Sequence, residues 1–492
     1  MPFPQESFSF GHFRRRDSRR PSTQPFSPLQ TEHDRHPQLP EFGPSLPVSS
    51  RASSDEDRSG LEDIEKALPL NTVPSLCLQQ SSQLDQNVSR DSASSAPENR
   101  PSDAQGRLPL RPRLAHFTWA WYTLTMSTGG LSLLIFSQPH QFPGLRQIGL
   151  TVYILNLVLF TAVTATMLTR FILFPSLILR SITHKREGLF VPTFFLSVAT
   201  LITSTQRYCV PEPPRVEGTP IEVDAALAAA LTAPGLTTAI HIAFWTYLLL
   251  STAVAIGQYS YIFSAHSFGL QTMMPTWILP IFPIMLSGTI AAVIADSQPP
   301  QSAIMITTAG LTCQGLGLSV AFMMYAHMVG RLMQSGLPDR EHRTGLFMCV
   351  GPPAFTALAF LGMARALPDS TFAENMYGMM DVNTIKTMAV VGAAFLWALS
   401  FWWFGIAVLA VVRAPPRYFH LGWWAAVFPN TGFVLATIAL GEAFRSDGVK
   451  WFATGMSICL VGTYLFVLGN HVRAVVVQEI LYPGKDEDVE DH

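Results

Sequence analysis

One stretch of the chain has the length and apolarity of a membrane span, yet it contains three prolines. It runs from Met274 to Ala295, has no Asp, Glu, Lys or Arg, and holds Pro275, Pro280 and Pro283. A proline inside a helix removes a backbone donor and clashes with the preceding turn. Interrupted backbone at membrane depth is tolerated where it is buried in protein or lines a water-filled cavity. The segment is therefore predicted to form part of the wall of a pore.

The remaining sequence divides into a polar tail and a long apolar region. Hydrophobic residues make up 48% of the 492 residues and charged residues 13%, but residues 1–113 are rich in Ser, Pro, Arg, Gln and Asp. Such a composition lacks the apolar surface that offsets the entropy of folding, so residues 1–113 are predicted to be a disordered cytosolic tail. Residues 114–478 are predicted to form a transmembrane domain, and residues 479–492 a short acidic cytosolic tail.

The N-terminal tail contains a basic cluster at residues 14–22, RRRDSRRPS. Its spacing puts Ser18 and Ser22 where a kinase that prefers basic residues can modify them, and a phosphate there would reverse the local charge. The alternative, which the composition favours, is a solvated basic segment that contacts anionic lipid.

Ten apolar runs follow the tail, each near the length that a helix needs to cross a bilayer. They cover residues 117–136, 148–171, 190–206, 237–262, 273–295, 302–330, 344–364, 384–412, 421–441 and 451–475. An even number of spans puts both ends of the chain on one side of the membrane. Arg and Lys gather before the first span and in the loops of that side, while most acidic residues lie in the opposite loops. By the positive-inside rule, both termini are predicted to be cytosolic.

Helix-breaking residues occur in alternate spans. The third, fifth, seventh and ninth spans contain proline, the first has Gly129-Gly130 at its middle, and the even-numbered spans have no proline. The alternation predicts an all-α integral membrane protein made of five helical hairpins. Five interrupted inner helices would surround a central pore with quasi-fivefold symmetry, and five continuous helices would shield them from lipid. The alternative is the general enrichment of proline in membrane helices.

The predicted inner helices offer polar but uncharged side chains. Their interiors contain no ionised group, which argues against a cation path lined by carboxylates. Interrupted helices also expose N–H groups at helix N-termini, which favour anions, so the solute is predicted to be anionic or neutral. Each Ser or Thr taken alone is better explained by a bond to its own helix. The candidate pathway residues are Ser127, Thr128, Gly129, Gly130, Thr200, Pro280, Pro283, Pro353, Pro429 and Asn430.

Two larger side chains are also candidates. Arg365 ends the seventh span, and its side chain either extends to the outer surface or contacts a carboxylate at the pore mouth. Phe428 directly precedes Pro429 and either projects into the axis as a hydrophobic gate or packs in the core. The sequence has no metal-binding, nucleotide-binding or nucleophile motif. No cofactor, bound metal or nucleic-acid partner is expected.

Several short segments, in order along the chain, carry a resemblance to a known family. They are residues 116–119, 127–130, 277–283, 314–317, Phe347 with 350–355, 428–430 with 432–434, and 482–488. Together they resemble the tellurite-resistance/dicarboxylate transporter family, in particular its fungal malic acid permease branch, which is related to plant slow anion channels. The resemblance spans residues 115 to 488 and omits only the N-terminal tail.

The resemblance implies a ten-helix protomer with its own pore, assembled as a homotrimer. Phe428 matches a phenylalanine on the family's ninth helix that closes the pore, and Phe355 lies in a matching segment and is added to the pathway. Arg365 matches an arginine of the permease branch. With this match, contact with a carboxylate at the pore mouth and extension to the outer surface are equally favoured for Arg365. The implied function is transport of malate, and of succinate, fumarate and malonate, across the plasma membrane together with protons.

The lack of a carboxylate inside the spans bears on how a proton would move. The proton is expected to travel on the substrate, which enters as the singly charged monoanion. The alternatives within the same fold are a sulfite efflux pump and a passive anion channel. An integral-membrane transferase is an alternative from another class, although it would need a cluster of His, Asp or Cys near a membrane surface, which the sequence lacks.

Overall fold

In the residues that the computed structural model describes, 109–210, 234–367 and 381–481, there are helices and turns but no β-strand. The all-α prediction is confirmed for these ranges, which all belong to one structural unit, Pro101–His492. The first described helix, α3 (Leu110–Ala115), begins within the last residues of the predicted tail. The rest of that tail, with Ser18 and Ser22, lies outside the described residues, as do residues 482–492 of the predicted acidic tail.

Within these ranges, nine helical segments are long and apolar enough to cross a membrane. Five are single α-helices: α5 (Leu145–Leu173), α9 (Pro234–Ala265), α11 (Pro300–Ser335), α14 (Val382–Arg413) and α16 (Asp447–Val477). Four begin as a 3₁₀ helix and continue as an α-helix. These are η3 (Glu187–Phe190) with α7 (Val191–Cys209), η5 (Pro275–Ile281) with α10 (Phe282–Ile294), η7 (Arg340–Val350) with α12 (Gly351–Arg365), and η8 (Leu421–Ala426) with α15 (Phe428–Ala443).

The first predicted span is shorter than these nine segments. It consists of η2 (Trp119–Trp121) and α4 (Tyr122–Phe136), an α-helix of 15 residues. The short connecting helices are α6 (Ser176–Thr183), η4 (Leu270–Thr272) and η6 (Ala295–Ser297).

Burial divides the segments into an inner and an outer group. In the four segments that begin as 3₁₀ helices, between 61% and 94% of the residues in the most apolar window are buried, against 22% to 39% in the five single helices. Most of α4 is also buried. The outer helices expose large apolar side chains, such as Ile172 on α5, Phe263 on α9 and Phe395 on α14. An apolar outer surface of this kind suits contact with lipid.

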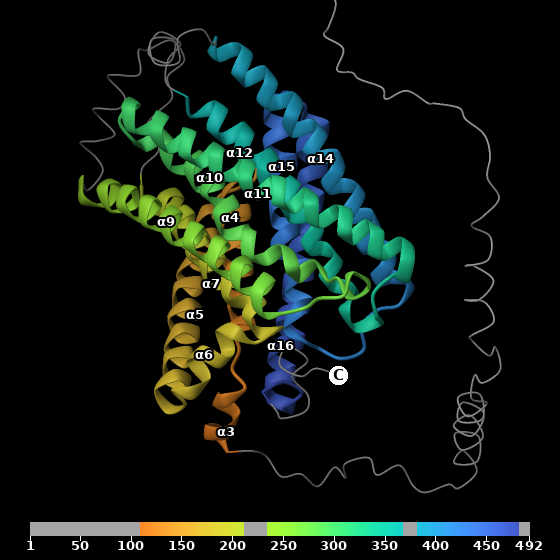
Figure 1. Ribbon diagram of the computed structural model, residues 1–492. Coiled ribbons are helices and arrows are strands. Elements are labelled where there is room, and N and C mark those ends of the chain that lie inside the picture. Colours follow the sequence, from red (N-terminus) through yellow and green to blue (C-terminus); the bar gives the residue numbers. More distant parts are fainter. Residues whose placement is uncertain (1–108, 211–233, 368–380, 482–492) are drawn as a thin grey trace, which may run out of the picture. The chain divides into compact units, whose positions relative to one another are not determined.

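The inner helices form a closed circuit of contacts. α4 packs against α7, α7 against α10, α10 against α12, α12 against α15, and α15 again against α4. Each outer helix contacts two neighbouring inner helices. α5 packs on α4 and α7, α9 on α7 and α10, α11 on α10 and α12, α14 on α12 and α15, and α16 on α15 and α4. Figure 1 shows α5, α9 and α14 along the outside of this part of the chain.

The predicted interruptions are junctions between a 3₁₀ helix and an α-helix. Pro192, Pro283, Pro352 and Pro429 each occupy the second position of an inner α-helix. The first turn of an α-helix has no intrahelical acceptor for its N–H groups, so proline removes no bond there. The interruption predicted at Gly129-Gly130 is wrong, because both glycines lie within the continuous helix α4. Two glycines lower helix propensity, but packing on all sides overrides so small a preference.

A buried ion pair joins α5 to η3. Arg170 Nη1 lies 2.7 Å from Glu187 Oε1, and the two side chains are 4% and 3% exposed. Arg170 Nε also donates to the Ala115 carbonyl at 3.1 Å, which ties the last residue of α3 to the same corner. Arg170 lies at the end of the second predicted span, 148–171, and its charge alone does not reveal that a partner 17 residues later folds back onto it.

Glycine allows α11 to approach α10 closely. A Cβ atom added to Gly310 would lie 2.5 Å from the Ala291 Cβ and 3.2 Å from the Ser287 carbonyl oxygen. Gly315, on the same helix, has nothing within 4 Å of such an atom. Helices in membranes associate through small residues of this kind, which bring the backbones together.

We predict opposite effects on stability for two alanine substitutions in α11. Gly310→Ala should destabilise the detergent-purified protein by about 1 to 3 kcal/mol, because the neighbouring backbone cannot move away from the added methyl group. Gly315→Ala should leave stability unchanged or raise it by up to about 1 kcal/mol through helix propensity. Thermal unfolding midpoints of the two variants test this, and equal midpoints would contradict the close approach of α11 to α10.

Candidate functional site

A wide cavity of about 310 Å³ lies among the inner helices. Its lining includes Gly130 of α4, Thr200 of α7, Thr289 of α10, Phe355 of α12 and Thr431 of α15. No residue of an outer helix is among its described lining residues. The volume falls at the lower end of the range of small-molecule sites, about 300 to 1,000 Å³. The cavity is therefore enclosed by the circuit of inner helices and is large enough for a small solute.

Charged groups line the wide cavity beside the neutral hydroxyls. Arg207 comes from the last turn of α7, Arg365 from the end of α12 and Glu442 from the end of α15. Arg365 Nη2 donates to Glu442 Oε2 at 2.7 Å, and the two side chains are 45% and 40% exposed. The Arg207 guanidinium lies 5.7 Å from the centroid of the Phe136 ring. Guanidinium groups bind carboxylates through paired hydrogen bonds, so the cavity has the chemistry to bind an organic anion.

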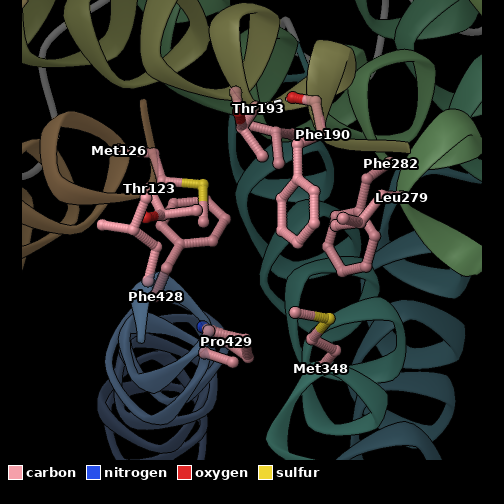
Figure 2. A pocket seen from close by; sticks show the side chains of 13 residues that line it. Thr123, Met126, Phe190, Thr193, Leu279, Phe282, Met348, Phe428 and Pro429 are labelled. Carbon is pink, nitrogen blue, oxygen red and sulfur yellow. Dashed lines mark hydrogen bonds between the residues drawn. The ribbon is translucent and has the colours of Figure 1, made fainter. Parts of the chain in front are cut away.

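A narrow cavity of about 20 Å³ lies at the beginnings of the same helices. Its polar side chains are Thr123 and Thr193, whose hydroxyls already donate to the carbonyls of Ala120 at 2.6 Å and Trp119 at 2.9 Å. Figure 2 shows apolar side chains from several elements gathered around it. They are Met126, Phe190, Leu279, Phe282, Met348 and Phe428. A space this small and apolar holds little water.

Phe428 is the one residue that the described linings of both cavities share. It is 3% exposed, and its ring stacks on that of Phe355 with centroids 5.1 Å apart and an interplanar angle of 29°. A Cβ atom on Gly130 would lie 3.4 Å from Phe428 Cδ2, so the glycine leaves room for the ring. The first residue of α15 therefore borders the wide cavity on one side and the narrow cavity on the other.

The inner helices all run in the same direction past these cavities. The narrow cavity is bordered by the first turns of the inner α-helices and the segments before them, and the wide cavity by residues further along each helix. The positive ends of several helix dipoles thus point toward the narrow cavity.

The expectation of exposed N–H groups at the interruptions needs correction. The first N–H at each of four junctions is already bonded: Val191 donates to Gly188, Phe282 to Leu279, Gly351 to Met348 and Val427 to Trp424. The 3₁₀ turn uses this donor because its bonds span one residue fewer than those of an α-helix.

The predicted site residues fall into four groups. Gly130, Thr200, Phe355 and Arg365 line the wide cavity, Pro429 lines the narrow cavity, and Phe428 lines both. The remaining candidates are outside both linings: Ser127, Thr128, Gly129, Pro280, Pro283, Pro353 and Asn430.

Several members of the last group have packing roles. Thr128 Oγ1 bonds to the Leu124 carbonyl at 2.8 Å and lies 2.9 Å from the Tyr464 hydroxyl of α16. An added Cβ at Gly129 would collide with the Thr200 side chain, so this glycine brings α4 against α7. Asn430 Nδ2 donates to the Ala426 carbonyl at 2.8 Å.

The sequence did not single out Arg207, Glu442 or the apolar side chains that surround Phe428 in the narrow cavity. Arg207 and Glu442 lie at helix ends, where charged residues usually face solvent. Met126, Phe190 and Met348 belong to apolar runs in which no residue stands out. Their convergence depends on how the inner helices pack, which spacing along one helix does not reveal.

The geometry describes a helical membrane protein with an anion-compatible cavity inside it. Comparison with known proteins gives the family: residues 116–472 match the model of the voltage-dependent anion channel family. The chain is 35% identical over 389 residues to the malic acid transport protein of Schizosaccharomyces pombe, covering 77% of this chain and 83% of that protein. A second S. pombe protein, whose name assigns it provisionally to malic acid transport, is 32% identical over 391 residues, covering 78% and 85%. The sulfite efflux pump of Trichophyton rubrum is 26% identical over 374 residues, covering 75% and 93%.

The chain belongs to the voltage-dependent anion channel family. It is a multi-pass membrane protein, and its similarity to malic acid transport proteins supports an organic-acid anion transporter. The resemblance to the malic acid branch is confirmed. Because the family and these relatives are transport proteins and not enzymes, the transferase alternative is set aside. In the described ranges no group of three or more His, Cys, Asp or Glu side chains is arranged to hold a metal ion.

Two threonine substitutions distinguish a side chain that packs between helices from one that lines the wide cavity. Thr128→Val should destabilise the protein by about 1 to 3 kcal/mol, because it leaves the Tyr464 hydroxyl without its partner between α4 and α16. Thr200→Val should cost under about 1 kcal/mol, because this hydroxyl bonds to its own helix at Ser197 and lines the cavity. Unfolding midpoints in detergent check the difference, and an equal or larger loss in Thr200→Val would contradict these positions.

Proposed function

We propose that this protein transports C4-dicarboxylic acids such as malate across the plasma membrane, along the axis enclosed by the inner helices. The position of Phe428, which borders both cavities, is the observation that carries the proposal. The arginines and hydroxyls of the wide cavity suit carboxylates. The class of solute is supported by the relatives named as malic acid transport proteins.

In this proposal Phe428 is a hydrophobic gate. The apolar side chains around it leave about 20 Å³ on the side of the helix N-termini. An anion entering such a space would lose its hydration without gaining hydrogen-bond partners, which is unfavourable. Movement of the Phe428 ring away from Phe355 would widen this passage, and the dipoles of the surrounding helices would then favour an anion over a cation.

The complete architecture of the proposal has ten spans in five hairpins with quasi-fivefold symmetry. Two observations support it. The inner helices form a closed circuit, and each inner helix is followed in the chain by an outer helix that packs against two neighbouring inner helices. With both termini cytosolic, the wide cavity would open to the outside and the narrow cavity would face the cytosol. Assembly as a homotrimer is expected from the family resemblance.

Proton linkage would follow from the charge state of the solute. We propose that malate enters as the monoanion and carries its proton with it, because the narrow cavity has no acidic side chain among its described lining residues to relay one. Succinate, fumarate and malonate would be transported in the same way. The candidate pathway residues outside the two linings would then support the helices around the path.

A sulfite efflux pump is the second candidate, favoured by the match to the Trichophyton rubrum protein. The higher identity to the malic acid transport protein favours the dicarboxylate. A passive anion channel would differ in producing unitary currents in a planar bilayer.

We predict that Phe428→Ala increases malate uptake into proteoliposomes several-fold, because the ring no longer blocks the passage between the cavities. Phe433→Ala is the matched control. Phe433 lies on the same helix and is 1% exposed, but it packs against Trp397 and Phe404 of α14, away from both cavities. An unchanged or lower rate in Phe428→Ala, or an equal rise in Phe433→Ala, would rule out the gate.

Uptake at a constant total malate concentration is predicted to track the monoanion as external pH is varied. Raising the pH converts monoanion to dianion, so the initial rate should fall in proportion to the remaining monoanion. Radiolabelled uptake into liposomes with a fixed internal pH measures this relation. A rate that follows the dianion would exclude transport of the proton on the substrate.

A further inference from the structure

The 3₁₀ helix η8, which directly precedes α15, borders the narrow cavity and also contacts α16. Three of its residues line the narrow cavity: Leu421, Gly422 and Ala425. Trp424 is outside the described lining and is fully buried, with 0% exposure. Its carbonyl accepts a hydrogen bond at 3.0 Å from the N–H of Val427, the residue before Phe428. The position of Trp424 therefore bears on the position of the proposed gate.

Trp424 is hydrogen-bonded to a histidine of α16. Its indole Nε1 donates to His471 Nδ1 at 3.2 Å, and His471 is 3% exposed. An indole N–H can only donate, so His471 accepts through Nδ1 and, as an uncharged ring, carries its proton on Nε2. Nε2 has no hydrogen-bond partner among the described residues. Within the described part of the chain, the bond to Trp424 is thus the one hydrogen bond of this imidazole.

Aromatic side chains hold the His471 ring in place. The ring of Trp121, from η2, lies 4.8 Å away between centroids, and the ring of Phe419, just before η8, stacks at 5.3 Å with an interplanar angle of 22°. His471 cannot shift without disturbing these contacts. It therefore gives η8 a fixed point of attachment on α16.

A fixed η8 matters because the narrow cavity is closed by contact between its walls. The cavity has a volume of about 20 Å³, so η8 has little room to move further inward. A displacement of η8 would instead separate apolar walls that now leave no room for a solute. Because the backbone of η8 continues into α15, it would also move Phe428 relative to Phe355, on which its ring stacks.

We propose that His471 is a positioning residue of the gate. Through its hydrogen bond to Trp424 it holds η8, and with it Phe428, in the closed arrangement. Since α16 is one of the outer helices, this bond attaches the gate to the layer of helices that faces lipid. The inference rests on the proposed function and adds to it the contact that keeps the Phe428 gate closed.

Two substitutions at His471 separate the hydrogen bond from the ring packing. His471→Phe keeps an aromatic ring and removes the acceptor, so it should raise malate uptake into proteoliposomes several-fold. His471→Asn loses the ring, but its Oδ1 is bonded to Cγ as Nδ1 is, so it keeps an acceptor in nearly the same place. The His471→Asn rate should lie closer to the wild-type rate than to the His471→Phe rate. A His471→Asn rate equal to or above that of His471→Phe would overturn the inference.

Trp424→Phe removes the same hydrogen bond from the donor side. It should raise uptake as His471→Phe does, and it decides the question if His471→Phe does not fold. The double variant should be no faster than the faster single variant, because both substitutions remove one bond. Independent increases that multiply in the double variant would contradict a shared role.

Trp397→Phe is the matched control. Trp397 Nε1 donates to Thr437 Oγ1 at 2.8 Å, so this bond also joins an outer helix, α14, to an inner one, α15. Neither residue is in the described lining of either cavity. The rate per folded protein should therefore stay at the wild-type value. In a Phe428→Ala background, adding His471→Phe should give no further increase, because the side chain that it holds in place has been removed.

The outcomes separate this inference from the function on which it rests. If Phe428→Ala takes up no more malate than the wild type, the proposed gate fails and the inference falls with it. If Phe428→Ala raises uptake but Trp424→Phe and a folded His471→Phe keep the wild-type rate, only the inference is overturned. The same holds if Trp397→Phe raises uptake as strongly, or if His471→Phe has its full effect in the Phe428→Ala background.

Discussion

The structure depends on one constraint: a backbone donor or acceptor at membrane depth needs a partner, because lipid offers none. A proline has no N–H, so an interrupted segment leaves carbonyls without an intrahelical donor, whereas a continuous α-helix pairs all of its interior backbone groups. The chain accordingly places α7, α10, α12 and α15 in the interior and covers them with continuous helices that contain no internal proline. The same alternation brings the first turns of the inner helices together, and these first turns border the narrow cavity beside Phe428.

This arrangement separates two kinds of environment along one axis. At the beginnings of the inner helices mostly apolar side chains leave little space, while further along hydroxyls, arginines and Glu442 join apolar side chains around a wide cavity. An anion can be solvated by the wide cavity but not by the narrow one, which is the physical basis for a closed gate in our proposal. The buried pair of Arg170 and Glu187 lies apart from this axis, and since breaking such a pair leaves a buried charge, it serves to hold α5 and η3 together.

Proline position and hydropathy predicted which of the other nine segments are inner and which are outer, because both follow directly from the membrane constraint. The inner helix α4 has no proline, and it was assigned from Gly129-Gly130, which do not interrupt it. The exact form of the interruptions was not predictable, since proline is compatible both with a kink and with the first turn of a helix. Thr128 was predicted on the pathway but faces Tyr464, because composition does not fix which side of a helix meets the axis. Glu442 was missed for a related reason: at a helix end it looks like a solvent-exposed charge, and only packing puts it beside Arg365 in a cavity.

Water access to introduced cysteines tests the central claim most directly. In a background without native cysteines, Thr203→Cys lies in the lining of the wide cavity, whereas Leu249→Cys lies on α9, where Leu249 is 69% exposed on the outer surface. If the inner helices enclose an aqueous path and the outer helices face lipid, a membrane-impermeant thiol reagent modifies Thr203→Cys and leaves Leu249→Cys unmodified in sealed proteoliposomes. Modification of Leu249→Cys together with protection of Thr203→Cys would contradict the account.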